Sequence, residues 1–242
     1  MIAAAKKSAR RRAPGRPPNR APLSPDAIVQ AALALIDAGG LEGLSMRKLG
    51  QSLGVEAMAI YHHFEDKGRL LDAVLDRLAE EVVILERGAA APVERLRRAV
   101  ISYRAIAVRH PRAFVLLAGR RFNGERSFAV YERLLSVFTD AGLDAPRAAL
   151  WFRLIGGYAS GAGMADVASR EKVPDATPLR LEHQPEDLPY PTVRLVAPHL
   201  KSDRLEALFE ASLDVLLGAL ERELDSTRRA IGKTRPRPAQ RR

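Results

Sequence analysis

The sequence of 242 residues contains no cysteine, and only 5% of its residues are aromatic. The absence of cysteine excludes disulfides, thiolate nucleophiles and thiolate metal sites, and it fits a reducing cytoplasm. Runs of β-branched residues are missing while Ala, Leu and Arg are abundant, which favours helices. No apolar run approaches the ~20 residues of a membrane helix, and no apolar segment of a secretory signal follows the basic start. We therefore expect an all-α cytoplasmic protein without a membrane partner.

Acidic residues are absent from both ends of the chain. Residues 1–22 and 226–242 each contain seven Lys or Arg and no Asp or Glu, so the net charge of +10 leaves −4 on residues 23–225. Such blocks are expected to be disordered and to bind polyanions, the alternative being that they only keep the chain soluble. Within the first block, Pro14-Gly15-Arg16-Pro17 resembles the core of an AT-hook, in which arginine lies in a narrow A·T-rich minor groove. Arg16 is therefore a candidate DNA-binding residue.

Helical spacing of apolar residues and capping residues divide the rest of the chain. Ser24 followed by Pro25 predicts a helix start, Gly39-Gly40 its end, and Ser45 and Asp66 two further starts. The Gly88–Pro92 stretch is a plausible boundary. We expect a disordered basic arm (1–22), a helix-turn-helix domain with a linking helix at 67–87 (23–87), a helical ligand-binding and dimerisation bundle (88–225) and a disordered basic tail (226–242).

The bundle is predicted to contain six helices and one long loop. The proline-rich stretch 171–191 is expected to be that loop, either a lid or a disordered segment. The helices are expected over 92–109, 111–121, 125–141, 146–169, 192–200 and 203–225.

The segment 44–64 meets the requirements of a helix-turn-helix. Gly54 tolerates the positive φ of the turn, and Leu49, Leu53, Val55 and Ile60 can form its small core. At 100° per residue, the helix over 56–64 directs Met58 and His62 away from that core, with Ala59 and Tyr61 on the flanks. Such a free face suits a helix that lies in a DNA groove.

The order of motifs in this segment resembles the DNA-binding domain of TetR-family transcriptional regulators. The motifs are Gly-Leu-Ser (43–45), Arg-Lys-Leu (47–49), Leu-Gly-Val (53–55) and Ile-Tyr-X-His-Phe-X-X-Lys (60–67), within a match that covers about 24–75. The resemblance implies that Ser45, Tyr61, His63 and Lys67 contact phosphates, that Arg47, with Lys48 beside it, reaches the DNA from the preceding helix, and that Met58, Ala59 and His62 face the groove.

The reading helix departs from the common family pattern at its start. Glu56-Ala57-Met58-Ala59 stands where Ser or Thr is frequent, so few donors face the bases and contacts to thymine methyls are favoured. We therefore expect Arg47 to make the main hydrogen-bonded base contact. The alternatives are that Tyr61 packs at the core edge, that His63 caps or packs, and that Arg47 and Lys48 form a solvated face. We expect no metal and no cofactor, because the adjacent His62 and His63 splay apart and no further ligand completes a site.

Charge within residues 23–87 does not favour DNA, because six basic residues stand against eleven acidic ones. The arm is therefore expected to supply the attraction, since each phosphate that it neutralises releases counterions.

The larger domain is expected to bind a ligand and a second copy of the chain. The resemblance implies that the helices at 146–169 and 203–225 form a four-helix dimer interface, although the glycines of the first also permit a kinked helix. The interface candidates are Gly157, Gly161, Leu208, Leu213 and Leu216. Few charges stand at helical spacing with the pocket candidates, which indicates a largely apolar effector. Arg153 and Asp166 are the exceptions, and the alternative for both is a position on the surface. The pocket candidates are Phe114, Leu117, Phe122, Phe138, Trp151, Phe152, Tyr158 and Met164.

The leading hypothesis is a dimeric repressor that leaves a palindromic operator on double-stranded DNA when it binds a small molecule. The alternative is an architectural DNA-binding protein that relies on its basic tails. An enzyme is disfavoured because no Ser/His/Asp, metal or phosphate-loop pattern is present.

Overall fold

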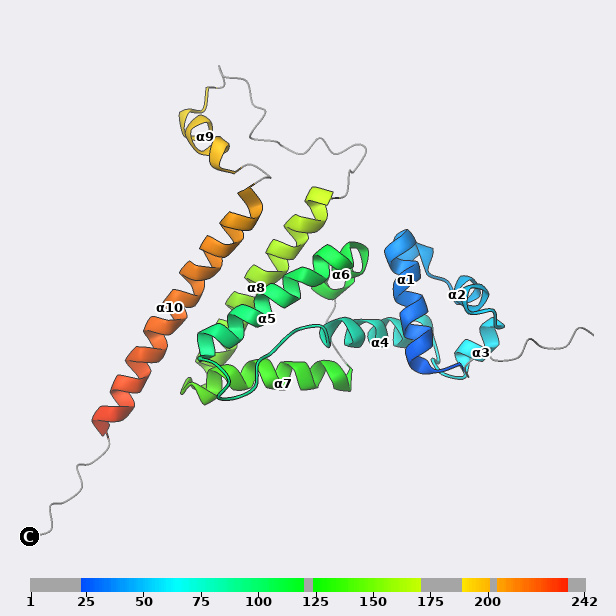
Figure 1. Ribbon diagram of the computed structural model, residues 1–242, viewed down its shortest axis with the longest axis horizontal. Helices are drawn as coiled ribbons and strands as arrows, with labels where there is room; N and C mark the ends of the chain where they lie inside the picture. The colour runs from blue at the N-terminus through cyan, green and yellow to red at the C-terminus, as the bar shows by residue number, and fades with distance from the viewer. Residues whose placement is uncertain (1–22, 120–123, 171–188, 201–203, 235–242) are drawn as a thin grey trace, which may run out of the picture.

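The computed structural model describes residues 23–119, 124–170, 189–200 and 204–234, and across these residues the chain is helical with no strand. The expected all-α fold is confirmed. The four amino-terminal helices form one end of the molecule and a bundle forms the other, with the fourth helix running from the first into the second (Figure 1). The elements are α1 (Pro25–Gly43), α2 (Met46–Leu53), α3 (Ala57–Tyr61), α4 (Lys67–Ala79), α5 (Pro92–Arg109), α6 (Pro111–Gly119), α7 (Glu125–Asp140), α8 (Ala145–Arg170), α9 (Pro191–Val196), the 3₁₀ turn η2 (Ala197–His199) and α10 (Leu205–Thr234).

Local caps set the starts of the amino-terminal helices, as the sequence predicts. The Ser24 Oγ accepts from the Ala27 amide and the Ser45 Oγ from the Lys48 amide, each at 3.2 Å. The Asp66 carboxylate accepts from the Arg69 amide at 2.8 Å. Each such cap stabilises its helix by about 1 kcal/mol.

The first helix breaks where Gly39-Gly40 predicts its end, because Gly40 has a non-helical φ of 67°, and a short helical piece follows as far as Gly43. Helix α4 ends at Ala79, so the expected linking helix over 67–87 is eight residues too long. Beyond Ala79 the chain is non-helical, and side chains of the bundle bind its backbone. The Val83 amide donates to the Ser102 Oγ at 2.8 Å, and the Leu85 carbonyl accepts from the Arg95 Nε at 2.8 Å.

The boundary at residue 226 also fails, because α10 extends to Thr234. The hydroxyls of Ser226 and Thr227 donate to the Glu223 carbonyl, and Arg228 lies 3.4 Å from Asp225. Cationic residues near a helix carboxyl end also interact favourably with its dipole. The arm at 1–22, the rest of the tail and most of the predicted loop lie outside the described residues.

The core runs from α1 to α10 and includes one buried ion-pair cluster. Arg104 of α5 donates to both carboxylate oxygens of Asp166 on α8, at 2.6 and 3.0 Å, and to Glu206 of α10 at 2.7 Å. Its guanidinium also lies 4.1 Å from the centre of the Phe209 ring. Asp166, expected near the pocket or on the surface, is instead 7% exposed and joins α8 to α5.

Candidate nucleic-acid interface and ligand cavity

Helices α2 and α3 meet through the turn that the sequence predicts. Gly54 ends α2 with a φ of 63°, in the left-handed region. A second glycine, absent from the sequence predictions, lets the two helices approach. A Cβ on Gly50 would lie 2.8 Å from the Val55 carbonyl oxygen and 3.2 Å from the Ala57 amide nitrogen. Any larger residue at position 50 would therefore push the turn away from α2.

The face of α3 that the sequence assigns to DNA is free in the structure. Met58 is 66% exposed and Tyr61 42% exposed, whereas Ile60 between them is fully buried. His62 and His63 are exposed at the end of the helix, and Ala59 is half-buried. The regular helix spans only Ala57–Tyr61, shorter than the predicted 56–64.

Four polar side chains that the sequence assigns to DNA differ in how far they are already engaged. The side chains of Arg47 and Lys48 on α2 are exposed and make no hydrogen bond or ion pair within the described part of the chain. The Ser45 Oγ accepts from an amide, so its own hydroxyl hydrogen stays available. The Lys67 Nζ donates to the carbonyls of Leu44 and Leu41, at 2.7 and 3.3 Å. One of its three donors remains for a phosphate. Arg16 lies outside the described residues.

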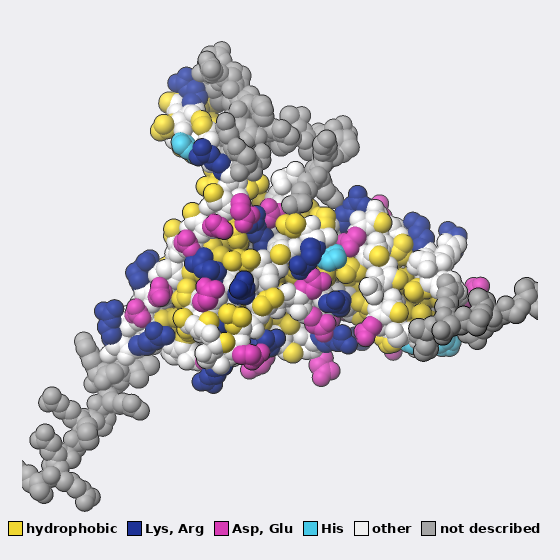
Figure 2. Space-filling model, in the orientation of Figure 1, with side chains coloured by type: hydrophobic (Ala, Val, Ile, Leu, Met, Phe, Trp, Pro, Cys, Tyr) yellow, Lys and Arg dark blue, Asp and Glu magenta, His cyan; other side chains and the backbone are white. Residues whose placement is uncertain are grey.

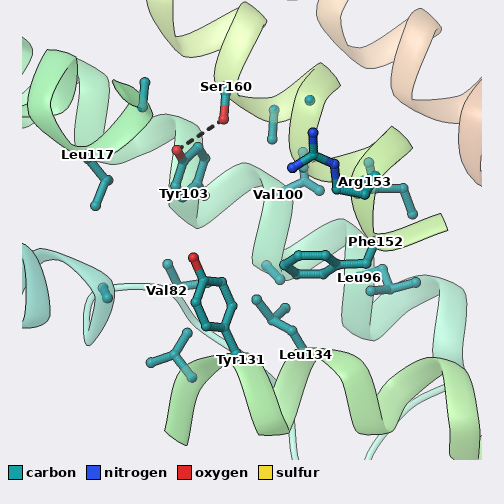
Figure 3. A pocket seen from close by; sticks show the side chains of 18 of the residues that line it. Val82, Leu96, Val100, Tyr103, Leu117, Tyr131, Leu134, Phe152, Arg153 and Ser160 are labelled. Atoms are coloured by element: carbon teal, nitrogen blue, oxygen red, sulfur yellow. Dashed lines mark hydrogen bonds between the residues drawn. The ribbon is translucent and has the colours of Figure 1, made fainter. Parts of the chain in front are cut away.

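A cavity of ≈ 470 Å³ lies within the bundle, between α5, α6, α7 and α8 (Figure 3). Pockets that bind small molecules usually fall in this size range and are mostly apolar. Leu117, Phe138 and Phe152, three of the predicted pocket residues, line it. The lining residues missing from the sequence prediction include Tyr103, Tyr131, Leu134 and Ser160, while Arg153, the charge noted near the pocket candidates, also lines the cavity.

The other predicted pocket residues serve the fold. Phe114 is fully buried, and a Cβ on Gly163 would overlap its ring, which accounts for that glycine as a close approach. The Trp151 Nε1 donates to Glu223 at 3.0 Å, and the Tyr158 hydroxyl donates to the Phe209 carbonyl at 2.7 Å. Met164 is 37% exposed and does not line the cavity, and Phe122 lies outside the described residues.

Aromatic rings and hydroxyls define the cavity wall. The Tyr131 and Phe152 rings meet edge to face, with centroids 5.7 Å apart. The Tyr103 hydroxyl lies 3.1 Å from the Ser160 Oγ. Burial raises the pKa of the Tyr103 phenol, against a smaller opposing effect of the Ser160 bond, so the phenol stays neutral at physiological pH. No sequence pattern joins these residues, because they come from three helices.

The predicted dimer residues divide between the outer face and the core. Gly157 and Gly161 are exposed, with no atom within 4 Å of the position that a Cβ would take, and Leu208 is 38% exposed. Leu216 is half-buried. Leu213 is 1% exposed and packs inside its own chain, so it cannot reach a partner, and that assignment is wrong. Apolar residues missing from the prediction share the outer face, with Leu154 46% and Val215 73% exposed.

Helix α6 joins the cavity to the DNA-reading end. Its last residues, Leu117 to Gly119, line the cavity. Directly before its first residue, the His110 Nδ1 lies 2.7 Å from the Asp37 carboxylate of α1, and in its first turn Arg112 donates to the carbonyls of Asp37 and Ala38. A displacement of α6 would therefore act directly on α1.

Two further observations concern the surface charge and the helix lengths. Basic and acidic side chains are interspersed on the visible face of the bundle (Figure 2). None of the described helices is long and apolar enough to cross a bilayer.

Two family models match the chain. The model described as "Bacterial regulatory proteins, tetR family" matches residues 28–74, and the model "Tetracyclin repressor-like, C-terminal domain" matches residues 89–224. The first match contains α2, α3 and most of α4, and the second contains all the residues that line the cavity except Ala79 and Val82.

Curated relatives and solved structures agree with these matches. The HTH-type transcriptional repressor DrrR1 of Streptomyces coeruleorubidus is 34% identical over 164 residues, 65% of this chain and 60% of the relative, so the chain spans less than two thirds of that protein. The class G tetracycline repressor of Vibrio anguillarum is 27% identical over 83% of this chain and 94% of its own length. ActR of Streptomyces coelicolor, solved with actinorhodin, is 25% identical with a TM-score of 0.72, over 84% of this chain and 99% of ActR.

Proposed function

The chain belongs to the tetR family of bacterial regulatory proteins, and on that basis we propose that it is a dimeric cytoplasmic repressor that releases a palindromic operator when a ligand fills the cavity of its bundle. The observation that supports this proposal most directly is the position of α6, which lines the cavity at one end and binds α1 at the other. A ligand and an operator can then influence each other through one rigid element.

On the DNA side, α3 enters the major groove with Met58, Ala59 and His62 toward the bases. Such a face reads thymine methyls and groove shape rather than hydrogen-bonding edges. The exposed Arg47 of α2 supplies the main hydrogen-bonded base contact. Ser45, Tyr61, His63 and the remaining donor of Lys67 hold phosphates on both sides of α3.

A second copy docks on the outer faces of α8 and α10. Exposed small and apolar residues, among them Leu154, Gly157 and Gly161, follow α8 at the spacing of a helix-packing seam. Val215 of α10, 73% exposed, contributes to the same face. Two copies related by a two-fold axis present two α3 helices to a palindrome about one DNA turn apart.

On the ligand side, the mostly apolar wall favours an apolar and aromatic effector. ActR, a relative of 25–27% identity, was solved with actinorhodin and with (S)-DNPA. The effector binds more tightly to an arrangement of α6 that separates the two α3 helices from consecutive grooves, and this difference in affinity releases the operator.

A footprint of the full chain on the DNA upstream of its own coding sequence tests the proposal. We expect protection of a short palindrome, lost when an effector from a library of apolar aromatic compounds is added. Uniform coating of the DNA without a preferred site would contradict the proposal and favour the architectural alternative.

A further inference from the structure

Charged groups are nearly absent from the cavity wall. Of the described residues that line it, Arg153 of α8 is the one with a charged side chain, and none is acidic. The rest of the wall is aliphatic, aromatic or hydroxylic. Arg153 is itself exposed, so it lies at the mouth, next to Phe152 (Figure 3).

Arg153 has no partner within the described chain, whereas several other arginines of the bundle are engaged. Arg104 binds Asp166 and Glu206, and Arg147, two helical turns earlier on α8, binds Glu223 through its Nε at 2.7 Å. Asp76, an acid in contact with the lining residue Ser127, accepts from the Ser127 amide at 3.2 Å and from its hydroxyl. The guanidinium of Arg153 is therefore available to a ligand.

We propose that the cavity takes an aromatic ligand that carries a carboxylate or a similar anionic group, and that Arg153 pairs with this group. The inference rests on the proposed function of the cavity as the effector site and names the chemical class of the effector. The ring system lies among Phe152, Tyr131 and Tyr103, and the anionic group stays at the mouth. A guanidinium offers two parallel donors to a carboxylate, which fixes the orientation of the ring as well as adding affinity.

The electrostatics of the wall also disfavour a cationic ligand. With no acidic residue among the described lining side chains, an ammonium group would meet Arg153 without a counter-charge. A neutral ligand would fill the aromatic part of the cavity but leave the guanidinium to water. Selectivity for an acid over its neutral analogue is thus the property that Arg153 provides.

Three pairs of compounds test this proposal by calorimetry on the full chain: naphthalene-2-carboxylate, anthracene-9-carboxylate and anthraquinone-2-carboxylate, each with its carboxamide. The variants are R153M, R153K and, as a matched control, R98M. Arg98 is exposed on α5, has no partner within the described chain and does not line the cavity. Thermal unfolding of each variant checks the fold, and R153Q is the second substitution if R153M unfolds early.

We expect at least one acid to bind the parent chain about ten-fold more tightly than its amide, a ratio that R153M brings to about one. R153K should keep most of the preference and R98M all of it. Equal binding of acid and amide to the parent chain, or equal losses in R153M and R98M, would overturn the role of Arg153 and leave the cavity as the effector site. Failure of all six compounds to bind would overturn the aromatic effector cavity itself.

Discussion

The DNA-reading end and the bundle use apolar side chains in opposite ways. At the reading end, Leu49 and Ile60 are fully buried in a small filled core, and the exposed face of α3 is left for DNA. In the bundle, Tyr131, Leu134 and Phe152 surround a cavity instead of closing it. The first arrangement fixes the geometry of a reader, while the second leaves room for a ligand to change the packing.

Truncation of one apolar side chain in each region measures that difference. We expect I60A to lower the free energy of unfolding by about 2–5 kcal/mol, because a filled core relaxes only partly around the missing atoms. L134A should cost less than about 2 kcal/mol, because half-buried Leu134 already borders empty space. Urea denaturation followed by circular dichroism gives both values. Equal losses would show that the cavity wall is as tightly packed as the reading core.

Deletion of residues 2–20 tests whether the acidic reading domain depends on charge from outside it. The deletion removes seven Lys or Arg, so operator affinity should fall at least ten-fold. The slope of log affinity against log salt concentration should also become less steep, by ~0.9 for each phosphate that the arm no longer neutralises. Deletion of 235–242 is the control, since α10 ends far from α3 (Figure 1). An unchanged salt slope after the first deletion would show that the arm does not contact DNA.

Arg47→Ala examines how the reading face obtains specificity. If Arg47 makes a bidentate base contact, its loss should cost ~1–3 kcal/mol on the operator and much less on unrelated DNA. Lys48→Ala, the matched change at the neighbouring exposed cation, should weaken both DNAs similarly. Binding of each variant to operator and scrambled duplexes distinguishes the two patterns. If R47A also weakens both equally, Arg47 contacts only phosphate.

The separation along the chain between interacting residues decides how well each region can be predicted from the sequence. The caps at Ser24, Ser45 and Asp66 and the turn at Gly54 act on neighbours within a few residues, so patterns of residue type reveal them. Helical periodicity alone predicts that Met58 and Tyr61 are exposed on one short helix while Ile60 faces the core.

The bundle is less predictable because its features join distant residues. Beyond the end of α4, Arg95 and Ser102 bind the backbone of a segment for which the local sequence predicts a helix. Tyr103 and Ser160 meet across 57 residues, and nothing near either one in the sequence indicates a cavity. Leu213 belongs to the same apolar stripe as Leu208, and only packing shows which of them faces inward.

The smallest expected effect concerns the joint between the two regions. Asp37→Asn removes the charge that faces His110 but retains the shape of the side chain. Operator affinity without ligand and ligand affinity without DNA should each stay within about two-fold, whereas the effect of ligand on operator affinity should fall by about 0.5–2 kcal/mol. Titration of operator binding at several concentrations of a binding compound measures this coupling, and linkage requires the same change in the reverse titration.

Asp214→Asn is the matched control for the joint, because Asp214 forms an ion pair with Arg97 at 2.5 Å entirely within the bundle. It should leave the coupling intact. Equal coupling in D37N and the parent chain would mean that α6 acts on α1 through apolar packing or through the hydrogen bonds from the Arg112 side chain to α1 carbonyls. The carboxylate of Asp37 would then only support the fold. A loss confined to D37N would instead place the coupling at the contact between Asp37 and His110, where the filled reading end meets the bundle that holds the cavity.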